Sequence, residues 1–191
     1  MKLLAISGSP RRQSTNTALL LAMQEIAPAG FDIRVFDRVD ALPVFSPDAE
    51  GSMTPPAILE IAAQITWSDA VVISSPEYVR AIPGGLKNLI DWLVSRQEIV
   101  HKPIALAHAS HRGDDMLASL RRVLSTVSSC FLEHPFLRIP LLGQAPEEIR
   151  RLLTEAAYAD QVRMFLLQIA AARGAGTQAP SPTAGKVLHA P

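Results

Sequence analysis

One nine-residue stretch near the start of the chain concentrates groups that bind anions. It reads Gly8-Ser9-Pro10-Arg11-Arg12-Gln13-Ser14-Thr15-Asn16. Its hydroxyl, amide and guanidinium groups are all hydrogen-bond donors. The stretch follows a short apolar run and precedes residues with helical spacing, so it lies where a helix begins. Unpaired backbone N–H groups and the helix dipole favour an anion at that position, and we expect a phosphate monoester there.

The sequence lacks the two commonest phosphate loops. It has no Gly-x-x-x-x-Gly-Lys-Ser/Thr stretch and no Gly-x-Gly-x-x-Gly stretch. This argues against an ATPase of the P-loop type and against dinucleotide binding of the Rossmann type. A simpler interpretation of residues 8–16 is a polar turn in which Ser14 caps a helix and the arginines lie in solvent. The number of donors in so short a stretch favours the phosphate site.

Short apolar stretches predict buried β-strands, and stretches of helical periodicity predict helices between them. The expected strands cover residues 3–6, 31–36, 70–73, 104–107 and 136–139. The first expected helix follows the anion-binding stretch, and the others begin at residues 55–56, 83–84, 114–115 and 147, the last running to 172. Residues 38–56 carry four prolines and predict a long loop.

Strands that alternate with helices are typical of a doubly wound parallel sheet with helices on both faces. Such a sheet binds ligands beyond the carboxyl ends of its strands, at the point where the strand order reverses. The loops after the first, third and fourth strands are therefore the candidate site. The anion-binding stretch is the first of these loops.

Residues 8–16 resemble the Gly-Ser-x-Arg-x-x-Ser-x-Asn loop of the NADPH-dependent FMN reductase family, which includes quinone, chromate and azo-dye reductases. A second stretch, Pro76 to Trp92, is similar to the family's Pro-Glu-Tyr-Asn-x-x-x-Pro-Gly-x-Leu-Lys-Asn-x-Ile-Asp-Trp block. The two stretches follow the first and third expected strands, and the resemblance spans about residues 1–170. It implies a flavodoxin-like α/β fold, a doubly wound five-stranded parallel sheet that holds FMN.

The resemblance also implies roles for individual residues. The FMN phosphate would be held by Ser9, Arg11, Ser14, Thr15 and Asn16. The edge of the isoalloxazine ring would be lined, largely through backbone groups, by Pro76, Glu77 and Tyr78. The loop after the fourth strand would place Ser110 near the other side of the ring. No catalytic acid or base is expected, because the chemistry belongs to the cofactor.

Two departures from the family pattern lie at the expected site. Val79 stands where the family usually has Asn, which removes one polar side chain near the flavin. The loop from Ala109 to Asp115 lacks the glycine pairs often found there and carries His111 and Arg112 instead. An Arg112 side chain that pointed into the pocket would attract an anionic acceptor or the phosphate of NADPH, whereas a solvated one would have no role.

The resemblance implies an FMN-dependent oxidoreductase that takes a hydride from NADPH or NADH and reduces flavin, quinone or similar small acceptors. The alternative is an FMN-holding electron carrier or sensor that does not turn over NAD(P)H. Many short-chain flavodoxins are strongly acidic, whereas this chain has 18 basic and 18 acidic residues. The neutral balance favours the enzyme and gives no indication of binding to nucleic acid or to an anionic membrane.

Other reactive residues predict no further chemistry. His108 and His111 lack the Cys, Asp or Glu partners of a metal site, so we expect no metal. Without a Gly-x-Ser-x-Gly elbow, Ser110 and its neighbours are not a hydrolase triad. Cys130 is the one cysteine, and we expect it to be a small packing residue.

The domain organisation follows from composition. Residues 1–173 are expected to form the FMN-binding domain, and residues 174–191, rich in Gly, Ala, Pro, Ser and Thr, a flexible tail. With one cysteine and no apolar run long enough for a signal peptide or a membrane span, we expect a cytoplasmic protein. A helix with the apolar residues Leu86, Leu89, Ile90, Trp92 and Leu93, together with the family resemblance, predicts a homodimer or homotetramer.

Overall fold

Five parallel strands form the central sheet of the computed structural model, which describes residues 1–176. The strands are β1 (Lys2–Ser7), β2 (Asp32–Phe36), β3 (Ala70–Ser74), β4 (Ile104–His108) and β5 (Phe131–Arg138). Their order in the sheet is β2-β1-β3-β4-β5, which is the flavodoxin-like order. The predicted fold class is confirmed. The order reverses between β1 and β3, so the switch point lies beside the anion-binding stretch.

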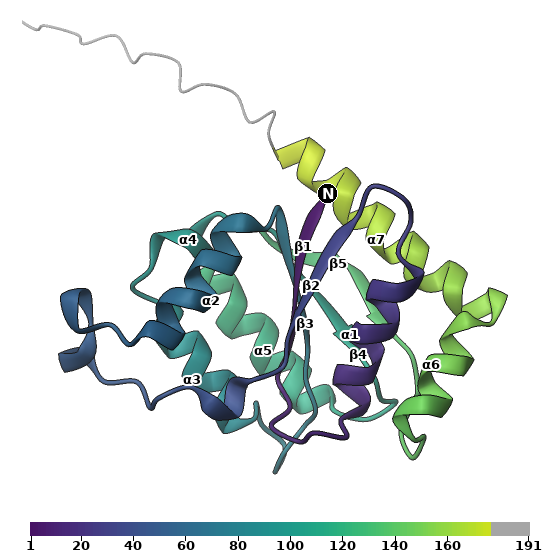
Figure 1. The fold of residues 1–191 in the computed structure, drawn as a ribbon, viewed down its shortest axis with the longest axis horizontal. Coiled ribbons are helices and arrows are strands. Elements are labelled where there is room, and N and C mark those ends of the chain that lie inside the picture. The colour runs from purple at the N-terminus through teal and green to yellow at the C-terminus, as the bar shows by residue number, and fades with distance from the viewer. Residues whose placement is uncertain (177–191) are drawn as a thin grey trace, which may run out of the picture.

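Helices cover both faces of this sheet (Figure 1). One face carries α1 (Thr15–Ile26), α6 (Pro146–Thr154) and α7 (Ala156–Gly176). The other carries α2 (Pro56–Trp67), α3 (Gly84–Leu93), α4 (Gln97–Val100) and α5 (Asp114–Val127). The predicted long loop between β2 and α2 contains three short 3-10 turns, Val39–Ala41, Pro47–Ala49 and Gly51–Met53.

Two apolar cores follow from the alternation of side chains along the strands. In β1, Leu3 and Ala5 belong to the core under α1, α6 and α7, whereas Leu4 and Ile6 belong to the core under α2, α3 and α5. This is why the strand reads as a continuous apolar run. Both faces of the sheet are buried, so the loops at its carboxyl edge are attached to well-packed strands.

Two elements differ from the sequence prediction. Strand β5 begins at Phe131, earlier than expected. It is an edge strand, and the exposed polar residues Glu133 and His134 interrupt the apolar run by which the sequence predicts a strand. The expected helix over 147–172 is two helices, separated at Glu155, whose backbone is extended (φ −62°, ψ 138°). Buried Leu153 and buried Ala159 are six residues apart, a spacing that would place them on different faces of one continuous helix. The break lets both segments pack on the core.

The apolar side chains of α3 do not form a free surface. The five residues named for self-association, among them Trp92, are all buried within the chain. The Trp92 indole nitrogen donates to the carbonyl of Pro43 (2.8 Å), and its ring packs edge-on against Phe45. This argument for an oligomer was therefore wrong, and the oligomeric state needs other support. The predicted tail lies almost wholly outside the described residues, although α7 continues to Gly176.

Candidate functional site

The carboxyl ends of β1, β3, β4 and β5 open into one pocket of about 660 Å³. Its wall includes all nine residues that the sequence predicted as cofactor ligands, namely Ser9, Arg11, Ser14, Thr15, Asn16, Pro76, Glu77, Tyr78 and Ser110. These residues come from three loops that are far apart in the sequence. The parallel topology alone brings them together, as predicted.

The loop after β1 presents donors at the start of α1. The Ser14 hydroxyl accepts the N–H of Thr17 (3.4 Å) and caps the helix. Within residues 1–176 the backbone N–H groups of Thr15 and Asn16 have no protein acceptor. Unpaired N–H groups at a helix N-terminus bind anions. The helix cap and the unpaired N–H groups therefore lie in one loop.

Three side chains of this loop are buried and polar. Ser9, Ser14 and Asn16 are each less than one-twentieth exposed. The Ser74 hydroxyl donates to Oδ1 of Asn16 (2.9 Å), which holds the acceptor end of the amide against β3 and leaves its NH2 donors for a ligand. The Arg11 guanidinium folds back on the loop, where its Nε donates to the carbonyl of Gln13 (2.8 Å). A cation and several neutral donors thus surround one small volume.

Gly8 allows this loop to approach the next one closely. A Cβ at this position would lie 2.6 Å from Oγ of Ser75 and 2.7 Å from Cδ2 of Leu86. Real Cβ atoms essentially never come so close to other heavy atoms. The N–H of Gly8 also donates to the carbonyl of Ser74 (2.8 Å), which ties the loop to β3.

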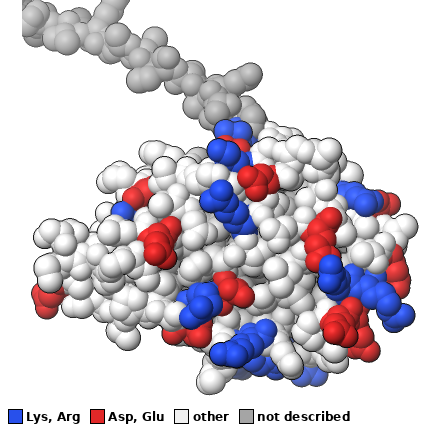
Figure 2. All heavy atoms as spheres, viewed as in Figure 1, with Lys and Arg blue, Asp and Glu red and all other residues white. Residues whose placement is uncertain are grey.

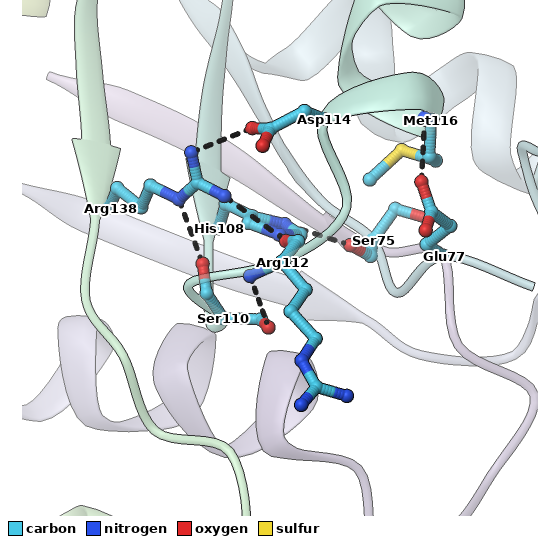
Figure 3. A network of polar contacts seen from close by, with 8 residues as sticks. All are labelled: Ser75, Glu77, His108, Ser110, Arg112, Asp114, Met116 and Arg138. Carbon is cyan, nitrogen blue, oxygen red and sulfur yellow. Dashed lines mark hydrogen bonds and ion pairs between the residues drawn. The ribbon is translucent and has the colours of Figure 1, made fainter. Parts of the chain in front are cut away.

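The loop after β3 forms the second wall. Its Glu77 side chain has a structural use, because Oε2 accepts the N–H of Met116 in the first turn of α5 (2.9 Å; Figure 3). The Glu77 carboxylate is therefore engaged within the chain. Tyr78 pairs with Ala81 across a two-residue turn.

The tip of that turn is Val79-Arg80. Both residues have positive φ, +52° and +59°, as a type I′ turn requires. A β-branched residue is strained in this region, whereas Asn tolerates it. The Val79 side chain is 98% exposed and is not part of the pocket wall. Its departure from the family pattern therefore acts on the backbone of the turn and not on the polarity of the pocket.

The loop after β4 is held by two residues at the strand ends (Figure 3). The Arg112 carbonyl contacts Nε2 of His108 (2.5 Å) and accepts from Nη2 of Arg138 (3.2 Å). Arg138 also donates to the carbonyl of Ser110 (2.8 Å) and pairs with Asp114 (2.8 Å). The third wall of the pocket thus has a fixed main chain.

His108 is 1% exposed, and its Nδ1 contacts the carbonyl of Ser75 (3.1 Å). Burial lowers the pKa of His108 below its ordinary value of 6.5, and the Arg138 charge adds to the lowering, while the contacts with the two carbonyls and the Asp114 charge oppose it. A neutral imidazole has one N–H, so it donates to only one of its two carbonyl neighbours. Gly113 (φ +102°) leaves the room for this ring, since a Cβ there would lie 2.8 Å from Nε2.

Sequence reasoning missed part of the wall. The loop after β5 contributes Leu142, Gly143 and Gln144, and the end of β4 contributes His108. The sequence placed the site at the loops after the first, third and fourth strands, but β5 lies beside β4 and ends at the same edge. His111 is exposed and does not line the pocket. In the described part of the chain, no three His, Cys, Asp or Glu side chains gather into a possible metal site.

Comparison with known proteins agrees with this geometry. Residues 1–140 match the profile of the NADPH-dependent FMN reductase family. Over 113 residues the chain is 34% identical to a quinone reductase of Escherichia coli (strain K12) and 37% identical to an NAD(P)H-dependent FMN reductase of Pseudomonas aeruginosa. Each match covers 58% of this chain and 60% of the relative, so the chain spans about three-fifths of the length of these curated relatives.

Solved structures show the same fold. The flavoenzyme NAD(P)H:(acceptor) oxidoreductase FerB from Paracoccus denitrificans superposes with a TM-score of 0.64 at 21% identity, covering 86% of this chain and 98% of that one. An azoreductase from Bacillus anthracis gives 0.57 at 18% identity, covering 86% of this chain and all of that chain. A flavodoxin-like sheet with a polar pocket at its switch point is the architecture of a flavin-binding α/β protein. The chain belongs to the NADPH-dependent FMN reductase family.

Proposed function

We propose that this chain is an FMN-dependent NAD(P)H oxidoreductase that reduces flavin, quinone or similar small electron acceptors. The proposal rests on the group of hydrogen-bond donors at the start of α1. Free N–H groups of Thr15 and Asn16, buried polar side chains and the Arg11 cation converge on the wall of one pocket. A dianionic phosphate monoester matches this set of donors.

The residues present fit FMN. The pocket volume of about 660 Å³ lies in the usual range for cofactor sites, roughly 300–1,000 Å³. The start of α1 supplies hydroxyl, amide and guanidinium donors to the wall, and the loops after β3 and β4 supply the rest of the proposed ligand set. When bound, FMN accepts a hydride from NAD(P)H and passes electrons to a second acceptor.

The chain's own residues bind and orient. The phosphate ligands are Ser9, Arg11, Ser14, Thr15 and Asn16. The ring is lined by Pro76, Glu77, Tyr78 and Ser110. The Glu77 carboxylate stays at the start of α5, so Glu77 acts through its backbone. No side chain is needed as a catalytic acid or base.

Anaerobic addition of NADPH and NADH to the FMN-loaded protein tests the proposal. The enzyme is expected to lose its visible flavin absorbance within seconds and to regain it when a quinone is added. A protein that binds FMN but is bleached by neither nucleotide is an electron carrier or sensor. A protein that binds no FMN contradicts both functions.

We also propose that the protein is a homodimer or homotetramer in the cytoplasm. Tyr78, Val79 and Leu142 are exposed apolar side chains on the loops after β3 and β5, and a second copy of the chain would cover them. Light scattering that gives the mass of a single chain at micromolar concentration contradicts the oligomer.

The single cysteine suits a reducing compartment, and cell fractionation tests the location. None of the described helices combines the length and apolarity that a membrane crossing requires.

A further inference from the structure

The main chain of Arg112 is fixed on both sides. Its carbonyl contacts His108 and accepts from Arg138, at 2.5 Å and 3.2 Å. Its N–H donates to the Ser110 hydroxyl (3.0 Å). Both backbone polar groups of Arg112 therefore have partners within the chain. His108 at the end of β4 and Arg138 at the end of β5 therefore set the direction of the Arg112 side chain.

The neighbouring carboxylates are engaged elsewhere. Asp114 pairs with Arg138 (2.8 Å), and Asp115 pairs with Arg80 (2.5 Å). Glu77 accepts the N–H of Met116. Exposed ion pairs contribute little energy, but Arg138 is also bonded to two carbonyls, so its pair with Asp114 has a set geometry. Within residues 1–176 the Arg112 guanidinium has no ion-pair partner.

The free guanidinium belongs to the pocket. Arg112 lines its wall together with Arg11 and Glu77. Figure 3 shows the Arg112 side chain extending away from the cluster of His108, Arg138 and Asp114. The face drawn in Figure 2 carries Lys and Arg interspersed with Asp and Glu. The exposed Arg112 is available to a second ligand.

We propose that Arg112 is a specificity-determining residue that binds an oxyanion group of the second substrate, and that His108 and Arg138 position it. The inference rests on the proposed function. A guanidinium presents a planar fork of donors that matches phosphate, carboxylate and sulfonate groups. Two sources supply such a group: the ribose phosphate of NADPH, or an acidic substituent of the electron acceptor.

The test compares Arg112→Gln with Arg122→Gln in the FMN-loaded protein. Arg122 is an exposed arginine of α5 that does not line the pocket, so the control removes the same charge. Two ratios of kcat/KM are measured: NADPH over NADH with one acceptor, and a sulfonated naphthoquinone over its unsubstituted counterpart with one donor. Arg112→Gln is expected to lower one of the two ratios about tenfold, and the ratio that falls identifies the source of the oxyanion. Arg122→Gln is expected to leave both ratios unchanged.

Arg138→Lys tests the positioning role. Lysine keeps the charge, but it cannot donate to two carbonyls and a carboxylate in one fork. The ratio that depends on Arg112 is expected to fall in this variant although no charge is lost. A ratio equal to that of the parent would overturn the positioning role. Both ratios unmoved in Arg112→Gln, with flavin bound and turnover present, would overturn the inference itself. A parent protein without flavin or turnover would instead overturn the proposed function.

Discussion

His108 and Arg138 stand opposite each other in the β4–β5 pair and converge on one atom, the carbonyl oxygen of Arg112. One of the two is buried and the other reaches the surface. Because His108 and Arg138 are the last residues of their strands, their contacts anchor the loop between β4 and α5 to the sheet. These contacts hold a charged loop in place without the glycine pairs of the family pattern.

The burial of His108 predicts that stability depends on pH. Its pKa is lowered in the folded protein, chiefly by burial, from an ordinary value of 6.5. Below pH 6.5 the His108 imidazole is protonated in the unfolded chain but stays neutral in the folded chain. The free energy of unfolding therefore decreases as the pH is lowered from 6.5 to the folded-state pKa. Above pH 6.5 His108 is neutral in both states, so it adds no pH dependence to the free energy of unfolding. Urea unfolding across the range measures this.

His108→Gln is expected to remove most of this dependence, since it leaves no titrating group at the site. His111→Gln is the matched control, because His111 is exposed on the same loop. A parent protein whose stability rises as the pH falls through 6.5 would show that His108 is held as the cation between its two carbonyls.

Gly8 is predicted to be irreplaceable for packing reasons. In Gly8→Ala the new methyl group would meet Ser75 and Leu86 at less than 3 Å. Overpacking of this kind costs about 1–3 kcal/mol of unfolding free energy. Gly84→Ala is the control, because no described heavy atom lies within 4 Å of a Cβ there and the site starts α3. The control is expected to be neutral or stabilising by up to about 1 kcal/mol. Equal losses in both variants would refute the steric account.

Val79→Asn is expected to stabilise the protein. Val79 has a φ of +52° at the tip of a two-residue turn, where Asn is favoured. Relief of this backbone cost is expected to raise the free energy of unfolding by about 1 kcal/mol, measured by denaturant unfolding. Val44→Asn replaces another exposed valine, one without positive φ, and controls for lost apolar surface. No gain in Val79→Asn relative to that control would mean that the turn is unstrained.

Much of the fold could be predicted because its signals are local. The run from Leu3 to Ile6 is apolar throughout since both faces of β1 are covered. The buried residues of α2, Ile58, Ile61, Ala62 and Ile65, have the three- and four-residue spacing by which a helix is predicted. The placement of the site followed from topology, because carboxyl ends of parallel strands share an edge.

The parts that could not be predicted depend on contacts across the fold. Glu77 reads as a pocket residue, but its carboxylate satisfies the start of a helix that begins far along the chain. The sequence predicts no role for His108, and only its contacts with carbonyls on two loops reveal a packing role. The break at Glu155 carries no proline or glycine signal, and it follows from packing on α1 and β5.

We expect residues 8–16 to hold the phosphate of FMN. The most direct test is the affinity of the parent and of Arg11→Ala for FMN and for riboflavin, measured by quenching of flavin fluorescence. Loss of a charge-assisted contact costs about 1.5–3 kcal/mol, so Arg11→Ala is expected to bind FMN at least tenfold more weakly than the parent. Its affinity for riboflavin is expected to stay near that of the parent. Arg12→Ala, at an exposed neighbour outside the pocket wall, is the control. Equal affinity of the parent for FMN and riboflavin, or no change in Arg11→Ala, would contradict the account.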